Sequence, residues 1–261
     1  MNKWHFIFNY LKYKSLSSNA HGIHSPFVFN LYNNVINNTK AYYSYDVIDG
    51  LRARLLKDTR ILAVTDLGAG SGSGLKKNRK VADIAAISAK SRKYSRLLFR
   101  LADCFQPEVI IEIGTSLGLS TVHLAIASSK SRVYTVEGCP ETRKVALENF
   151  EETGLKNISS LVGNFDQVLP GLLSEVPSAD MVFFDGNHRK EATLNYFVQC
   201  LEKAGNESVF IFDDIYWSKE MTEAWETIRV HPKVTVSIDL FQMGIIFFRK
   251  EQAKEHFILS Y

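Results

Sequence analysis

From residue 109 onward, short apolar runs alternate with longer stretches in which apolar and polar residues follow a helical period. The apolar runs are "VIIEI" from residue 109, "RVYTVE" from 132, "ISSLVG" from 158, "DMVFFD" from 180 and "SVFIFDD" from 208. An amphipathic stretch follows each of them, such as "PETRKVALENFEET" from residue 140. Five strand–helix units in succession predict a parallel sheet with helices on both faces.

The end of the chain follows a different pattern. "KVTVSIDLF" from residue 233 and "GIIFFRK" from residue 244 are separated only by "QM", which predicts an antiparallel hairpin. One of these two strands must therefore run against the parallel strands. The pattern predicts an α/β fold whose parallel sheet is finished by an antiparallel strand at its edge.

The first hundred residues lack this alternation. "NKWHFIFNYLKYK" from residue 2, "SPFVFNLYNNVINN" from 25 and "DVIDGLRARLLKD" from 46 predict short helices between polar turns. A basic stretch over residues 80–105 keeps helical spacing, with a break expected near Ser88–Ser91. We therefore divide the chain into a helical N-terminal extension or lid, residues 1–105, and an α/β domain, residues 106–261.

Composition narrows the class of protein. With 46% hydrophobic and 23% charged residues, the chain fits a soluble globular protein, and no apolar run reaches the length of a membrane span. The N-terminal "WHFIFNYL" lacks the cleavage site of a secretory signal. The three cysteines are far apart and match no metal-binding spacing, so we expect buried thiols and a cytoplasmic location.

The net charge of +3 conceals an asymmetry along the chain. Residues 1–100 carry 17 Lys and Arg against 5 Asp and Glu, whereas residues 101–261 carry 14 against 23. Either a basic layer packs on an acidic body, or the basic layer attracts an anionic substrate, membrane headgroup or nucleic acid. Because the basic and aromatic residues do not alternate as on a nucleic-acid platform, we expect no nucleic-acid partner.

Two glycine-rich segments compete as the site of a nucleotide-type ligand. In "VIIEIGTSLGLSTVHLA", a buried strand turns at Gly114 into a helix, and Gly118 permits close approach of a ligand. Glu137 ends the next strand about twenty residues later, where a carboxylate accepts both hydroxyls of a ribose. The second segment, "VTDLGAGSGSG" over 64–74, leads into the charged "LKKNRK", which favours a surface loop, a lid or a substrate loop. We therefore assign the ligand to the segment with Gly114.

This segment does not decide the ligand by itself. Its G-x-x-x-G spacing differs from the G-x-G-x-x-G of dinucleotide-binding turns, which weakens an NAD site. An NAD-dependent oxidoreductase and a non-catalytic cofactor-binding protein stay open as alternatives.

Acidic residues end two further strands. Asp185 follows "DMVFF", and Asp213 and Asp214 follow "SVFIF", so the carboxyl ends of the sheet bring them together near His188. Three carboxylates in one crevice repel each other unless a positive charge lies between them. A hard divalent cation, Mg²⁺ or Ca²⁺, takes such ligands. The alternative is that Asp213 or Asp214 caps the following helix while the other is solvated.

Over residues 90–249 the chain resembles the class I S-adenosylmethionine-dependent methyltransferases, and within them the catechol and caffeoyl-CoA O-methyltransferase-like group. The matching segments are "EIGTSLGLST", "TVEGCPE", "LVGNFDQVLP", "VFFDGNH" and "IFDDIYW". "HGIHSPFVF" near the N-terminus is similar to an extension in a group of methyltransferases largely from Bacteroidetes. The resemblance implies a Rossmann-like sheet of seven mostly parallel strands with an antiparallel final strand, and makes residues 106–261 the catalytic domain.

By position, the resemblance also implies which residues bind S-adenosylmethionine: Glu112, Gly114, Ser116, Gly118, Glu137, Gly138, Asn164, Phe165 and Asp185. Gly114, Ser116 and Gly118 are expected at its methionine portion. Glu137 is expected at the ribose, and Asn164 with Phe165 at the adenine.

The reaction that the resemblance implies is transfer of a methyl group to an oxygen of a small-molecule acceptor. The metal ligands fall on Asp185, Asp213 and Asp214, although many relatives have Asp-Asn where this chain has Asp213–Asp214. A bound metal would lower the pKa of an acceptor hydroxyl. His188 and Lys190 are candidates to take its proton, with Asp185 as a further catalytic residue. Relatives are often dimers, so a homodimer is expected.

Overall fold

The computed structural model describes residues 3–65, 78–88 and 90–261. Most of the glycine-rich segment over 64–74 lies outside these residues, and with it the question of its role as a lid. Among the described helices, none is long and apolar enough to cross a membrane.

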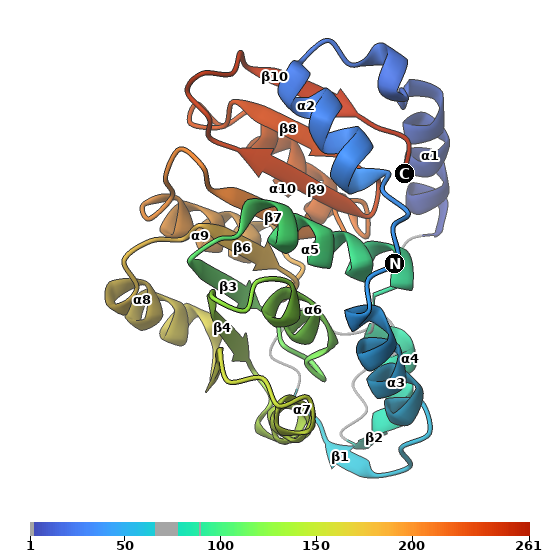
Figure 1. Cartoon of the computed structure of the whole chain (residues 1–261), viewed down its shortest axis with the longest axis vertical. Coiled ribbons are helices and arrows are strands. Elements are labelled where there is room, and N and C mark those ends of the chain that lie inside the picture. The colour runs from blue at the N-terminus through green and yellow to red at the C-terminus, as the bar shows by residue number, and fades with distance from the viewer. Residues whose placement is uncertain (1–2, 66–77, 89) are drawn as a thin grey trace.

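One sheet of eight strands organises the molecule (Figure 1), in the order β10-β8-β9-β7-β6-β3-β4-β5. Its strands are β3 (Val109–Ile113), β4 (Arg132–Glu137), β5 (Ile158–Val162), β6 (Met181–Phe184), β7 (Val209–Asp213), β8 (Val236–Asp239), β9 (Met243–Phe247) and β10 (Glu255–Ile258). The strands β3 to β7 are parallel, as predicted. A separate hairpin pairs β1 (Ile61–Ala63) with β2 (Asn78–Lys80).

The predicted C-terminal hairpin is confirmed, because β8 and β9 pair antiparallel. Its predicted place was wrong: β9 is the reversed strand and lies inside the sheet, antiparallel to both β7 and β8. The sheet also has one strand more than the seven expected. This strand, β10, pairs parallel with β8 and forms the edge. Three of its four residues are partly buried and His256 is exposed, so the apolar pattern that marks the other strands is weak there.

The order of the strands reverses at β3. From β3 the chain adds β4 and β5 on one side, and then returns to place β6 and β7 on the other. The carboxyl ends of β3, β4 and β6 therefore flank a topological switch point, where open α/β sheets bind ligands.

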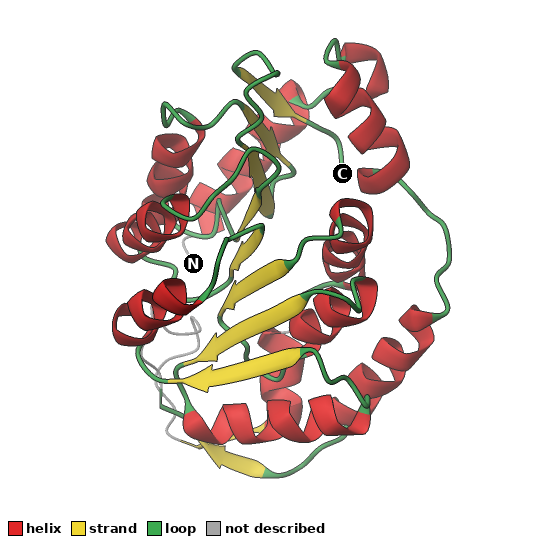
Figure 2. Cartoon of the chain, turned by 60° about the vertical axis from the view of Figure 1, so that its left-hand side comes forward, coloured by secondary structure: helices red, strands yellow, loops and turns green. Residues whose placement is uncertain are grey.

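Helices cover both faces of the sheet (Figure 2). Side chains of a strand alternate between faces, so Ile110 belongs to one core cluster and Ile111 to the other. The helices that pack with Ile111 are α8 (Phe165–Glu175), α9 (Lys190–Leu201) and α10 (Lys219–Arg229). Those that pack with Ile110 include α2 (Pro26–Leu31), α5 (Arg92–Phe105), α6 (Leu119–Ala127) and the π-helical turn Tyr32–Ile36.

The remaining helices come largely from the first hundred residues. They are α1 (Lys3–Leu16), a 3₁₀ turn (Ala20–Gly22), α3 (Ser44–Leu55), α4 (Val81–Ser88) and α7 (Pro140–Glu152). A third cluster joins α3 and α4 to α6 and α7, next to the turn after β3. The predicted break in the basic stretch is confirmed, because α4 ends at Ser88 and α5 begins at Arg92. The N-terminal helices thus reach the edge of the sheet where the ligand was expected.

Candidate functional site

At two of its positions, the turn after β3 has room only for glycine. Gly114 has φ +106°, and a Cβ atom there would lie 2.5 Å from the carbonyl oxygen of Asp185. Gly118 has φ +81°, and its Cβ would lie 2.5 Å from the ring of Phe150. An L side chain at either position would meet both a steric clash and an unfavourable backbone conformation. The glycines therefore let β3 approach β6 closely and let α6 start against α7.

Glu137, at the end of β4, is bonded to this turn. Its Oε2 accepts the backbone N–H of Ser116 at 2.7 Å, and its Oε1 accepts the N–H of Cys139 at 2.9 Å. Gly138 lies between Glu137 and Cys139 in the chain. Burial raises the pKa of the Glu137 carboxyl, against the lowering effect of these N–H donors. The carboxylate is thus fixed in place beside the glycine turn, and its contact with a ribose stays a prediction.

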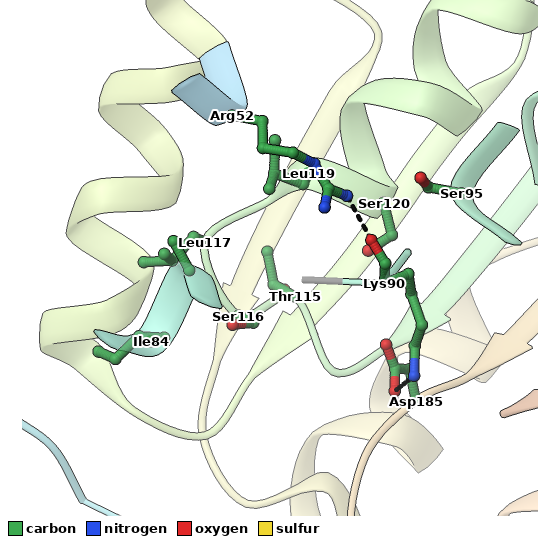
Figure 3. A pocket seen from close by; sticks show the side chains of 11 residues that line it. Arg52, Ile84, Lys90, Ser95, Thr115, Ser116, Leu117, Leu119, Ser120 and Asp185 are labelled. Atoms are coloured by element: carbon green, nitrogen blue, oxygen red, sulfur yellow. Dashed lines mark hydrogen bonds and ion pairs between the residues drawn. The ribbon is translucent and has the colours of Figure 1, made fainter. Parts of the chain in front are cut away.

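A cavity of about 370 Å³, part of it open to solvent, lies between this turn and the N-terminal helices (Figure 3). Thr115, Ser116 and Ser120 line it from the turn and α6, and Arg52 lines it from α3. Asp185 and Lys90 close another side. The cavity thus lies between the predicted cofactor turn and Asp185, one of the predicted acidic residues.

Asn164 and Phe165 follow β5 at the same edge of the sheet. Asn164 caps α8, because its Oδ1 accepts the N–H of Asp166 at 3.0 Å. A Cβ on Gly186 would lie 2.5 Å from the ring of Phe165, so this ring lies against the loop after β6. The ring of Phe165 also contacts Tyr196 edge to face, with centroids 6.0 Å apart. Phe165 is thereby held as an apolar wall near the switch point.

The three predicted acids meet around the side chain of Lys90, a cation that was not among the predicted site residues. Nζ of Lys90 lies 3.3 Å from Oδ1 of Asp185 and 3.9 Å from Oδ2 of Asp214, and it forms an ion pair with Oδ2 of Asp213. The Asp213 side chain is 1% exposed, and that of Asp214 is 34% exposed. The repulsion expected among these carboxylates is thus offset from within the chain.

Lys90 carries no motif, since it lies in the polar segment between α4 and α5. Two signals pointed toward it: the requirement for positive charge between the acids, and the excess of basic residues before residue 100. Neither identified which of 17 basic side chains would fill the place.

The two candidate bases lie in different surroundings. Nε2 of His188 is 3.8 Å from Oδ1 of Asp185, and its ring lies 5.9 Å from that of Trp217. Nζ of Lys190 instead forms an ion pair with Glu223 of α10 at 2.8 Å. Burial raises the pKa of Asp185, and the charges of Lys90 and His188 oppose this shift. Of the two candidate bases, His188 is therefore the one that contacts the acidic cluster formed by Asp185, Asp213 and Asp214, through Asp185.

The residues that could hold a metal ion differ in part from the predicted set. Among the described residues, Asp185, His188 and Asp213 offer ligand atoms that all lie within 4.8 Å of one another. Asp214 stands outside this group. Two carboxylate oxygens and one imidazole nitrogen suit a divalent cation, but the ammonium of Lys90 contacts the same two carboxylates.

Glu112 has a different environment from the other predicted cofactor residues. It is fully buried in β3, and its Oε2 accepts hydrogen bonds from the hydroxyls of Thr121 and Thr135. Burial raises its pKa to about 7. The side chain thus links β3 to α6 and β4 from inside the fold.

Comparison with known proteins agrees with this architecture. Residues 111–215 match a family described as a methyltransferase domain. A catechol O-methyltransferase of Mycobacterium tuberculosis is 32% identical over 132 residues, which cover 50% of this chain and 57% of that protein. One from Niastella koreensis is 29% identical over 133 residues, covering 50% and 58%. The chain therefore spans less than two thirds of the length of these curated relatives.

Solved structures share the fold. The O-methyltransferase of Bacillus cereus in complex with SAH superposes with a TM-score of 0.58, at 19% identity, over 81% of this chain and 93% of that one. The O-methyltransferase TomG of Streptomyces achromogenes, in complex with SAM, gives 0.55 at 23% identity over 62% and 82%. Residues 111–215 of this chain therefore match a methyltransferase domain, and the chain shares the Rossmann-like fold of these solved structures.

Proposed function

We propose that this protein is an S-adenosylmethionine-dependent O-methyltransferase that acts on a hydroxyl group of a small molecule. The observation that carries the proposal is the hydrogen bond from the backbone of the glycine turn to the carboxylate of Glu137. This turn lines a cavity that is also lined by Asp185, the ion-pair partner of His188. The names of the relatives support it: two are catechol O-methyltransferases, and two structural neighbours are O-methyltransferases solved with SAM or SAH.

The residues of the site fit the cofactor. Gly114 and Gly118 keep side chains away from the turn, so a ligand can approach its backbone. Glu137 uses one lone pair of each oxygen for backbone N–H groups, which leaves others for the hydroxyls of a ribose. Gly138 and Ser116 flank this carboxylate, and Asn164 and Phe165 would border the adenine.

When bound, S-adenosylmethionine supplies a methyl group on a sulfonium: the acceptor oxygen bonds to the methyl carbon, and the electron pair of the broken C–S bond stays on sulfur. The protein has to align the acceptor and remove its proton. His188 takes this proton in our proposal, because it is the candidate base at the cluster. Asp185 lies close enough to orient the imidazole and to stabilise its charged form.

A divalent cation is a further element to be tested. Asp185, His188 and Asp213 would hold it, with Asp214 at the margin, and it would lower the pKa of an acceptor hydroxyl. His188 would then be a ligand and could not also serve as the base. Lys90 contacts two of these ligands already, so ion and ammonium compete for the same oxygens.

Calorimetric titration with S-adenosylmethionine, with and without Mg²⁺, tests the proposal. We expect a dissociation constant in the micromolar range, which corresponds to about −8 kcal/mol. NAD in place of S-adenosylmethionine tests the oxidoreductase alternative, and binding of NAD alone would contradict the proposal. Incubation with catechol then separates an enzyme, which forms a methylated product, from a protein that only binds the cofactor.

A further inference from the structure

We propose that Lys90 is the resident cation of the cluster formed by Asp185, Asp213 and Asp214, and that its ammonium group, in place of a divalent metal, holds the oxygen of the methyl acceptor. The part that concerns the acceptor rests on the proposed function. The part that concerns the cation does not.

The position of the ammonium group carries the inference. It contacts a carboxylate at the end of each of two neighbouring strands, Asp185 after β6 and Asp213 in β7. Asp213 is almost completely buried, so its charge has little access to water and requires a partner inside the protein. Neither carboxylate oxygen of Asp213 has a hydrogen-bond donor among the described residues, so its Oδ2 is compensated by the ion pair with Lys90. Lys90 is therefore the main compensation for this carboxylate.

Lys90 also belongs to the lining of the cavity. Lys90 lines the cavity together with Ser116 and Asp185, and 16% of its side chain is exposed. Figure 3 shows its side chain running from the backbone near Arg52 to the carboxylate of Asp185. An acceptor oxygen in this part of the cavity can thus receive an N–H of Lys90. As His188 removes the proton of the acceptor, the charge that develops on the oxygen is stabilised by the ammonium.

The N-terminal helices fix this lysine from the other end. The guanidinium of Arg52 in α3 donates a hydrogen bond to the backbone carbonyl of Lys90. Asp49, one turn earlier in α3, pairs with Arg92 and Arg96 of α5 at 2.9 Å each. Residues on both α3 and α5 therefore hold the segment of Lys90 above the carboxyl edge of the sheet.

A divalent ion bound by Asp185, His188 and Asp213 would coordinate the same two carboxylates that Lys90 contacts. Two positive charges that share the same carboxylates lie close enough to repel each other strongly, so the ammonium of Lys90 and a divalent ion exclude each other. Removal of the lysine side chain should consequently turn the cluster into a metal site, since hard carboxylate oxygens remain without a partner.

The experiment measures Mn²⁺ binding to the full chain, by electron paramagnetic resonance of the free ion, and the midpoint of thermal unfolding with and without Mn²⁺. It compares the wild type with Lys90→Met, with the double variant Lys90→Met/Asp213→Asn, and with Lys130→Met as a control on an exposed lysine. We expect Lys90→Met to bind Mn²⁺ on the order of 100-fold more tightly than the wild type. Its midpoint should fall without Mn²⁺ and recover with it, whereas the double variant and the control gain no Mn²⁺ binding.

Wild-type Mn²⁺ binding that Asp213→Asn abolishes would overturn the proposal, as would equal binding by the wild type and Lys90→Met. If Lys90→Met does not fold, Mn²⁺ binding is compared between the wild type and Asp213→Asn alone. Absence of Mn²⁺ binding that depends on Asp213 then supports Lys90 as the resident cation. Methyl transfer to catechol should survive EDTA, and its loss in EDTA would contradict the metal-free role. A wild type that does not bind S-adenosylmethionine refutes the proposed function, and the Mn²⁺ comparison still decides the role of Lys90.

Discussion

The backbone N–H of Ser116 donates to Oε2 of Glu137 at 2.7 Å and thereby joins the turn after β3 to the end of β4. Ser116 has φ +49°, a conformation that a residue other than glycine adopts only at some cost. The hydrogen bond to a charged acceptor offsets this cost. Glu137 therefore supports the shape of the turn in addition to its proposed contact with the cofactor.

This double role predicts graded effects of substitution. Glu137→Gln keeps one carbonyl oxygen as an acceptor and should weaken S-adenosylmethionine binding about 10-fold. Glu137→Ala loses the acceptors for both the ribose and the turn, and should weaken it about 100-fold. Calorimetry measures both, with Glu141→Ala as a control because Glu141 is a partly exposed acid of α7 that pairs with Lys144. An affinity of Glu137→Ala within twofold of the wild type contradicts the assignment.

A pair of glycine variants tests whether the turn after β3 excludes a side chain. Gly114→Ala places a Cβ 2.5 Å from the Asp185 carbonyl oxygen at a positive φ, and should lower the free energy of unfolding by about 2 kcal/mol or more. Gly50 lies within α3, and a Cβ added there would meet no atom within 4 Å, so Gly50→Ala should raise it by about 0.5–1 kcal/mol. Urea unfolding gives both values, and equal effects of the two changes refute the steric argument.

The strands and the glycine turn were predictable because their signals are local. A buried parallel strand such as β3 is a continuous apolar run, and the glycines stand where it ends. The same reasoning placed Asp185, Asp213 and Glu137 at one edge of the sheet, since carboxyl ends of parallel strands meet there.

The partner of the acids could not be predicted in this way. Lys90 reaches Asp213 only because α3 and α5 fold over the edge of the sheet, a contact between distant parts of the chain that no periodicity encodes. Glu112 shows what a motif alone does not reveal. Its place in the motif predicts a contact with the cofactor, whereas in the structure the side chain is buried and accepts hydrogen bonds from two threonine hydroxyls. The place of β9 was missed because a hairpin pattern does not show which of its strands joins the sheet.

His188, in the loop after β6, and Lys190, the first residue of α9, differ in their expected roles. On the proposed function, His188→Ala should lower the rate of methyl transfer to the hydroxyl acceptor about 10²–10⁴-fold, with little change in S-adenosylmethionine affinity, because the base acts on the acceptor. Lys190→Ala should leave the rate within about twofold, since its ammonium pairs with Glu223 at 2.8 Å. Turnover and calorimetry together check both variants. If the rate of methyl transfer falls in Lys190→Ala and is unchanged in His188→Ala, Lys190 is the base and the assignment of His188 is wrong.

The buried carboxyl of Glu112 predicts a dependence of stability on pH. Its pKa is raised from 4.5 to about 7 by burial, so between these pH values the folded state holds a proton that the unfolded state has released. The stabilisation is complete below pH 4.5 and is lost as the pH rises through 7, by about 3 kcal/mol at most. Glu112→Gln, which is neutral throughout, should therefore gain stability relative to the wild type between about pH 5 and pH 8 in urea unfolding. Glu108→Gln, a change of an exposed carboxyl just before the same strand, should follow the wild-type profile. Parallel profiles for Glu112→Gln and the wild type would refute the assignment.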